Sequence, residues 1–184
     1  RVRMISIHEE WRWPFTGALQ DTARGSAFNL PVPKGYNDCE ARAVLHALIL
    51  PRVAEVRPEA IVLQCGADSL AEDPLSRLAL SNRAYLEAVA ALRPLAPRFL
   101  VLGGGGYNPW SVGRLWTAIW GTLGGHDLPD RLPGPAQDVL RALTWNGGGR
   151  PPPAPELLGT LIDAPRPGPV RAAIRDRLAR LAAR

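Results

Sequence analysis

The chain has 184 residues, of which 46% are hydrophobic and 21% charged, and its formal net charge is +5. This composition is ordinary for a globular protein, and no apolar run approaches the roughly 20 residues of a membrane span. Basic residues are mixed with acidic ones and are not interleaved with aromatic residues, which disfavours direct nucleic-acid binding. The first residues lack the layout of a signal peptide, so a cytoplasmic protein is expected, with no membrane partner.

The two cysteines, Cys39 and Cys65, have no Cys or His neighbour at metal-ligand spacing. Two thiols in a chain of this length are too few for a disulfide framework. We expect both to be free, with Cys65 a small core residue.

Three short apolar runs have the composition of buried strands, at Val2–Ile7, Ala60–Cys65 and Arg98–Leu102. Helical patterns lie between them, at 37–56, from 81 to about 92, and at 108–123. In the first helix Pro51 predicts a kink. In the third, Asn108 is the expected N-cap, Pro109 suits the first helical position and Gly124 is the expected stop. The alternation predicts an α/β fold with a parallel sheet and right-handed crossovers.

The composition changes near residue 125. Residues 1–125 hold the alternating strands and helices of one domain. Residues 126–184 are expected to pack on that domain as a Pro- and Gly-rich segment and a terminal helix. Within Asp127–Pro169 we expect irregular surface chain with one short helix near Ala136–Leu143. The terminal helix, Val170–Arg184, has a narrow apolar face that favours docking over membrane binding.

Residues that follow the strands are informative, because sites in open α/β sheets form beyond the carboxyl ends of strands. His8 follows the first strand and Asp68 follows the second. Tyr107 follows the third, after four glycines, Gly103–Gly106. One His, one Asp and one Tyr are therefore expected at one edge of the sheet.

Each of these features has more than one interpretation. Asp68 could bind a divalent cation, or it could cap the following turn through backbone amides. The glycines could cradle a phosphate, let the backbone pass close to a ligand, or form a plain tight turn; a plain turn is the weakest explanation, because consecutive glycines are entropically costly. His8 is more typical of a hydrogen-bonded structural residue than of a metal ligand.

Two motifs resemble one family. LQCGADSL at 63–70, followed by Asp73-Pro74-Leu75, resembles the zinc-binding segment of histone deacetylases and bacterial acetoin-utilisation deacetylases. LGGGGYN at 102–108 resembles their catalytic-tyrosine segment, and Ile5–His8 with the following Pro14–Gly17 resembles a third segment, with Phe15 in place of the usual glycine. The resemblance covers about residues 1–125. It implies the C-terminal half of an arginase-deacetylase fold, a three-layer α/β/α partial domain with a mostly parallel sheet.

The resemblance also implies roles for the matching residues. Asp68 would be one of three zinc ligands, with iron(II) the alternative metal, and Tyr107 would donate its hydroxyl to the substrate carbonyl and then to the oxyanion. The tunnel for the acyl-lysine stem would be lined by Trp13, Leu75 and Gly105. Oxygens for a structural potassium ion would come from Ser6 and Ile7. His8 matches a position outside the zinc shell.

The family's tandem His pair and its Asp-x-His zinc motif are absent from this chain. The implied activity is zinc-dependent hydrolysis of acetyl-lysine amides on an acetylated protein or a small acetylated amine. The chain alone is expected to be inactive, with the N-terminal half of the same domain as its partner. Two other functions stay open: a nucleotide-binding module that uses Gly103–Gly106, and a non-catalytic interaction fragment that docks through the basic terminal helix.

Overall fold

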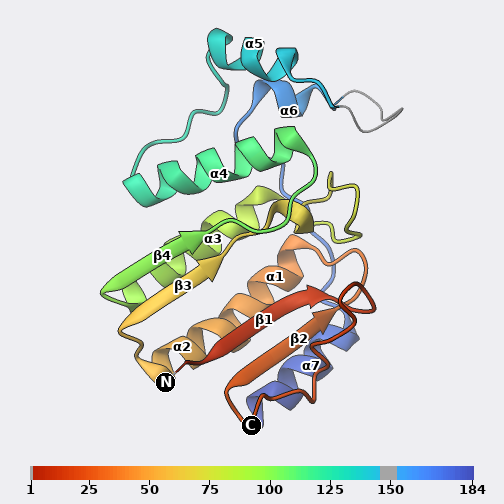
Figure 1. Ribbon diagram of the computed structural model, residues 1–184, viewed down its shortest axis with the longest axis vertical. Helices are drawn as coiled ribbons and strands as arrows, with labels where there is room; N and C mark the ends of the chain where they lie inside the picture. The colour runs from red at the N-terminus through yellow and green to blue at the C-terminus, as the bar shows by residue number, and fades with distance from the viewer. Residues whose placement is uncertain (1, 146–152) are drawn as a thin grey trace.

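The computed structural model describes residues 2–145 and 153–184 (Figure 1). Within these ranges, the strands are β1 (Met4–Glu9), β2 (Ala27–Val32), β3 (Ala60–Gln64) and β4 (Arg98–Leu102). They form two parallel pairs, β1 with β2 and β3 with β4. Parallel strands that alternate with helices confirm the predicted α/β class.

The strand predictions were right at β3 and β4, shifted at β1 and wrong at β2. The first strand begins at Met4 and continues to Glu9, two residues beyond the predicted end. The second was not predicted, because Asn29 and Pro31 interrupt its apolar pattern. Among the described residues β2 pairs only with β1 and is therefore an edge strand. Pro31 is tolerated because the unpaired edge of β2 needs no backbone N–H donor.

Helical elements separate β2 from β3 and β3 from β4, whereas β2 follows β1 directly in the element order. The helical elements are α1 (Asp38–Val44), the π-helical turn η1 (Leu45–Ile49), α2 (Leu50–Val56), the 3-10 turn η2 (Ala67–Ser69), α3 (Asn82–Leu92), the 3-10 turn η3 (Arg93–Leu95), α4 (Pro109–Gly124), α5 (Gly134–Ala142), α6 (Glu156–Gly159) and α7 (Ala172–Ala182). None of the described helices is both long and apolar enough to cross a bilayer.

The long first helix is irregular before Pro51 rather than at it. Residues 45–49 form a π-helical turn, and Leu50 N–H donates to the Leu45 carbonyl. Pro51 has no N–H to give to the preceding turn, and π-helical turns, although rare, occur as single turns inside α-helices. Proline therefore lies in the first turn of α2, where its missing donor costs little.

Two of the predicted helix starts are confirmed by side-chain caps. Asn37 and Glu40 form a capping box at α1, and the Asn108 side chain accepts from the N–H groups of Trp110 and Ser111 at α4. The predicted stop of α4 was one residue early. Gly125, at φ 69°, takes the left-handed conformation that ends the helix, while Gly124 is still helical.

The terminal helix α7 packs on β2 and η1, with Ile174 and Leu181 fully buried. This burial counts against a free interaction helix. Upstream, α5 matches the predicted short helix, and the four-residue α6 was not predicted. The part of the predicted irregular segment at 146–152 lies outside the described residues.

The helices leave one face of β3 and β4 uncovered. Leu63 and Val101 point from these strands into the core, whereas Val62, Leu100 and Leu102 on the opposite side are 61%, 53% and 44% exposed. We call these three residues the open face. In Figure 1 the helices α1, α2, α3 and α7 lie behind the strands.

The two strand pairs are also separated from one another. A groove of about 1000 Å³ lies between β1 and β3, and we call it the central groove. Its lining includes strand residues Ile5, Ile7, Ile61 and Leu63 and helix residues Leu45 and Ile49. Both strand edges that face this groove are unpaired among the described residues.

Candidate active site

Three loops follow the carboxyl ends of β1, β3 and β4, at residues 10–26, 65–81 and 103–108, and we call them the carboxyl-edge loops. They are bonded to one another. Ala67 N–H donates to the Gly105 carbonyl at 2.6 Å, and Arg77 Nε lies 2.6 Å from a carboxylate oxygen of Glu9 at the end of β1. The expected convergence of these loops at one edge is present.

The four glycines are explained by close contacts rather than by a simple turn. A Cβ on Gly105 would lie 2.2 Å from Oδ2 of Asp68, and a Cβ on Gly103 would lie 2.2 Å from the Trp116 ring. Gly106 has φ +142°, a backbone conformation that side chains rarely adopt. The loop thus passes directly beside a carboxylate, which counts against a cradle for an anionic phosphate.

Asp68 lies half-buried in the η2 turn, next to this glycine loop. The Leu70 amide, one of the groups that Asp68 was considered to cap, donates instead to the Ala67 carbonyl at 3.2 Å. Burial raises the pKa of Asp68, and the nearby charge of Asp73 raises it further, against a lowering by its own backbone N–H. A cation beside this carboxylate would favour the ionised form.

Tyr85 of α3 contacts the turn that holds Asp68. Its hydroxyl donates to the Gly66 carbonyl and contacts Ser69 Oγ, and burial raises its pKa well above the ordinary value. The sequence predicted a helix from 81 to about 92 around Tyr85 but not this role. Neighbouring Cys65 is a buried free thiol, and burial raises its pKa to about 11, as expected of an inert core residue.

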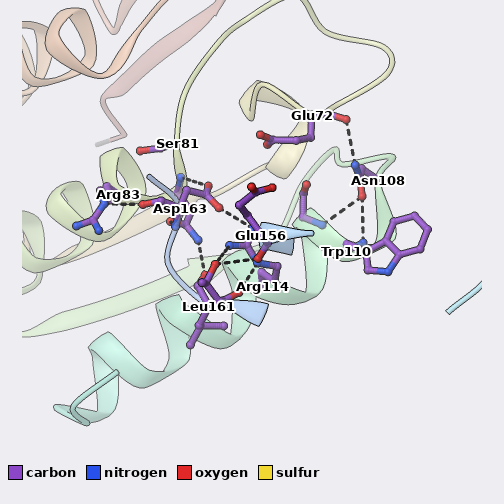
Figure 2. A network of polar contacts seen from close by, with 12 residues as sticks. Glu72, Ser81, Arg83, Asn108, Trp110, Arg114, Glu156, Leu161 and Asp163 are labelled. Carbon is purple, nitrogen blue, oxygen red and sulfur yellow. Dashed lines mark hydrogen bonds and ion pairs between the residues drawn. The ribbon is translucent and has the colours of Figure 1, made fainter. Parts of the chain in front are cut away.

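Tyr107 is 51% exposed, and it is held through its backbone. Its N–H donates to Oδ2 of Asp73 at 2.8 Å. The next residue, Asn108, caps α4 and also donates from Nδ2 to the Glu72 carbonyl at 3.1 Å (Figure 2). The tyrosine therefore sits between a strand end and a capped helix.

The predicted tunnel residues lie on different loops with open side chains. Trp13 is 85% exposed and Leu75 is 50% exposed. Arg12 donates to the Leu75 carbonyl, which connects the loop after β1 to the loop after β3. Phe15, where the family usually has glycine, has φ 62° and so keeps the left-handed backbone of a glycine position.

His8 has two hydrogen-bond partners and behaves as a structural residue. Its Nε2 lies 2.9 Å from the Gly17 carbonyl, which can only accept, so Nε2 carries the proton. The other ring nitrogen, Nδ1, lies 3.0 Å from Ser6 Oγ. Ser6 keeps lone pairs for a cation, and the predicted potassium site at Ser6 and Ile7 stays a prediction.

The described residues contain no group of three or more His, Cys, Asp or Glu side chains that could hold a metal ion. A catalytic zinc ion needs about three protein ligands. At the carboxyl edge, Asp68 fits one of these positions.

A buried polar network lies behind the loops and anchors the C-terminal segment (Figure 2). Arg114 of α4 forms an ion pair with Asp163 at 2.5 Å and donates from Nε to the Thr160 carbonyl at 2.7 Å. Asn82, at the start of α3, exchanges hydrogen bonds with Asp163 through side chains and backbone. Both members of the ion pair are buried, so the network ties α3 and α4 to residues 160–163.

Comparison with known proteins agrees with this geometry. A family model described as "Histone deacetylase domain" matches residues 1–123. Histone deacetylase 1 of Oryza sativa subsp. japonica is 39% identical over 139 residues, covering 72% of this chain and 27% of that protein. Histone deacetylase clr6 of Schizosaccharomyces pombe is 36% identical over 138 residues, covering 72% of this chain and 34% of its own length.

Solved structures extend the likeness to nearly the whole chain. A crystal structure of an HDAC homolog from Aquifex aeolicus matches with a TM-score of 0.88 and 35% identity, covering 98% of this chain and 50% of that one. An HDAC homolog complexed with SAHA matches with a TM-score of 0.85 and 36% identity. The predicted deacetylase-type α/β fold, present as a partial domain, is thereby confirmed. The chain spans about half of these structures, and it belongs to the histone deacetylase domain family.

Proposed function

We propose that this chain supplies one part of a metal-dependent deacetylase that hydrolyses acetyl-lysine amides. The observation that carries the proposal is the contact between Asp68 and Gly105: a half-buried carboxylate lies against the glycine loop that leads to Tyr107. A deacetylase needs a metal ligand and an oxyanion donor close together, and the two motifs bring one of each to the same edge.

In this proposal Asp68 is a ligand of zinc, with iron(II) as the alternative metal. The bound metal would act as a Lewis acid toward the amide carbonyl. Tyr107 presents its hydroxyl to the carbonyl oxygen and stabilises the negative charge that develops there. Trp13, Leu75 and Gly105 form walls around the acyl-lysine stem.

Ser6 and Ile7 are proposed to supply oxygens to a structural potassium ion at β1. The acetoin-utilisation branch, a cytoplasmic location and a substrate that is either an acetylated protein or a small acetylated amine belong to the same proposal. The substrate class is supported by the resemblance of the three motifs at residues 5–17, 63–75 and 102–108.

The partner is proposed to be the remaining half of the same domain. Three features support this: the described residues hold no group of three or more His, Cys, Asp or Glu side chains that could bind a metal ion, the central groove separates two strand edges, and the open face exposes Val62, Leu100 and Leu102. Parallel sheets are normally covered on both faces. The remaining half would complete the sheet and the ligand set, and the chain alone is proposed to be inactive.

The test uses the completed domain, in which this chain is joined to the remaining half, with an acetyl-lysine peptide as substrate. Asp68→Ala should abolish metal binding, measured by metal content, and activity. Tyr107→Phe should lower kcat by about 10²-fold or more while metal content is unchanged, because only an oxyanion donor is lost. Asp138→Ala, on the exposed face of α5, is the matched control.

Wild-type rates in Asp68→Ala and Tyr107→Phe would contradict the proposal. The nucleotide-binding alternative predicts a rise in melting temperature with nucleotides. The Asp68 carboxylate beside Gly105 would repel the phosphate groups of a nucleotide and counts against this alternative. The interaction-fragment alternative needs a free α7, whereas Ile174 and Leu181 are buried.

A further inference from the structure

Asp73 lies in the loop after β3, and its side chain is only 7% exposed. Both of its carboxylate oxygens accept hydrogen bonds from backbone N–H groups. Oδ1 accepts from Leu75 at 2.8 Å and from Ser76 at 3.1 Å, and Oδ2 accepts from Tyr107 at 2.8 Å. One buried carboxylate thus joins two loops that are 34 residues apart in the chain.

The residue before Tyr107 is Gly106, whose φ of +142° is a conformation that glycine adopts readily and other residues rarely adopt. A second bond, from Asn108 Nδ2 to the Glu72 carbonyl, holds the following residue to the same loop. The bonds to Glu72 and Asp73 therefore hold the backbone at Tyr107 and Asn108 to the loop after β3.

We propose that Asp73 is a positioning residue that holds Tyr107 and Leu75 in a fixed relation to one another. Asp73 would thereby fix the relative positions of the oxyanion donor Tyr107 and the tunnel residue Leu75. The roles of those two residues rest on the proposed function. A carboxylate suits this position because its two oxygens can accept several N–H bonds at once, and bonds to an ionised acceptor are stronger than neutral ones.

Two substitutions separate the two arms of this contact. Asp73→Asn keeps one acceptor oxygen for Leu75 and Ser76, but its amide N–H₂ would face the N–H of Tyr107. Asp73→Ala removes both arms. In the completed domain, Asp73→Asn should lower kcat for an acetyl-lysine peptide by about 10- to 100-fold with KM within about twofold, as for a small misplacement of a catalytic group. Asp73→Ala should in addition raise KM, because Leu75 is released.

A double-mutant cycle shows whether Asp73 acts through Tyr107. In a Tyr107→Phe background, Asp73→Asn should change kcat by less than about twofold, because the group that it positions is already lost. Hydrogen exchange provides a second readout: Asp73→Asn should deprotect the amide of Tyr107 and leave those of Leu75 and Ser76 protected. Asp138→Asn, 75% exposed, is the matched control.

An equal loss of kcat in both backgrounds, an unchanged kcat, or loss of exchange protection throughout the domain would overturn the assignment. If the completed wild-type domain has no deacetylase activity, the proposed function falls. Exchange at Tyr107 and Leu75 then decides by itself whether Asp73 holds the two loops together.

Discussion

The carboxyl-edge loops and the open face of β3–β4 differ in their contacts: polar groups of the loops have hydrogen-bond partners, whereas apolar side chains of the open face are exposed. In the loops, carboxylates and backbone amides from distant segments bind one another, as at Asp73 with Tyr107 and at Glu9 with Arg77. On the open face, Val62 and Leu100 lie opposite one another across the two strands and face outward.

This difference shows which part of the domain is organised within the chain. The loops have their own hydrogen-bond partners, so this part of the site can be held in place locally. Among the described residues, the strands lack covering apolar surface on one side and strand neighbours at the central groove, which is the basis for proposing that the remaining half completes the sheet. Four substitutions test this contrast, from the largest expected effect to the smallest.

Breaking the buried ion pair behind the loops should have the largest effect. Asp163→Ala leaves Arg114, which is 3% exposed, as an uncompensated buried charge. We expect a loss of about 3–5 kcal/mol in the free energy of unfolding, measured by denaturant titration of the completed domain. Asp138→Ala breaks an exposed pair with Arg141 and should cost less than about 1 kcal/mol. Equal losses in the two variants would remove the distinction.

Leu100→Ser tests the open face. If the remaining half covers this face, the substitution removes the burial of one leucine, worth about 1.5–3 kcal/mol. The dissociation constant between this chain and the remaining half should then rise by about 10- to 150-fold, as measured by calorimetry. Val139→Ser changes a similarly exposed residue on α5 and should leave affinity unchanged. Equal affinity for both variants would mean that the face stays open.

The third prediction concerns acid stability at the junction of α1 and the terminal segment. Glu40 is fully buried; burial raises its pKa, but hydrogen bonds from the Arg171 side chain and from the Arg171 and Asn37 backbone lower it more. A lowered pKa in the folded state stabilises the protein above the unfolded-state value of about 4.3, and this stability is lost as the pH falls through the folded-state value.

Glu40→Gln should therefore reduce the free energy of unfolding at pH 7 by about 1.5–3 kcal/mol. The difference from wild type should shrink toward pH 3, as followed by denaturant titration at several pH values. A difference that does not depend on pH would show that the carboxylate charge does not stabilise this contact.

Phe15→Gly should have the smallest effect and the opposite sign. Phe15 is 74% exposed and has φ 62°, so it keeps little buried area while its backbone is in the left-handed region. The left-handed backbone costs a non-glycine residue roughly 1–2 kcal/mol, which glycine avoids. Glycine also raises the conformational entropy of the unfolded chain, which cancels part of this gain in stability. The melting temperature of the completed domain should rise slightly. A fall would mean that the Phe15 ring makes contacts in the completed domain.

Local sequence signals determined much of this protein. The apolar runs at β3 and β4, the caps Asn37 and Asn108 and the order of strands and helices follow from short-range preferences that act within a few residues. The motifs around Asp68 and Tyr107 were sufficient to indicate the family. Both kinds of signal are contiguous in the chain.

The tertiary structure decided what depends on distant partners. Asn29 and Pro31 interrupt the apolar pattern of β2, so the sequence did not predict this strand. Its pairing with β1 supplies its hydrogen bonds. Asp73 was visible in the sequence only as a motif member, because its partner Tyr107 lies 34 residues away, and the partner of Arg114 lies 49 residues away. A buried carboxylate gains its role from the N–H groups and cations that surround it, and only the folded chain brings these together.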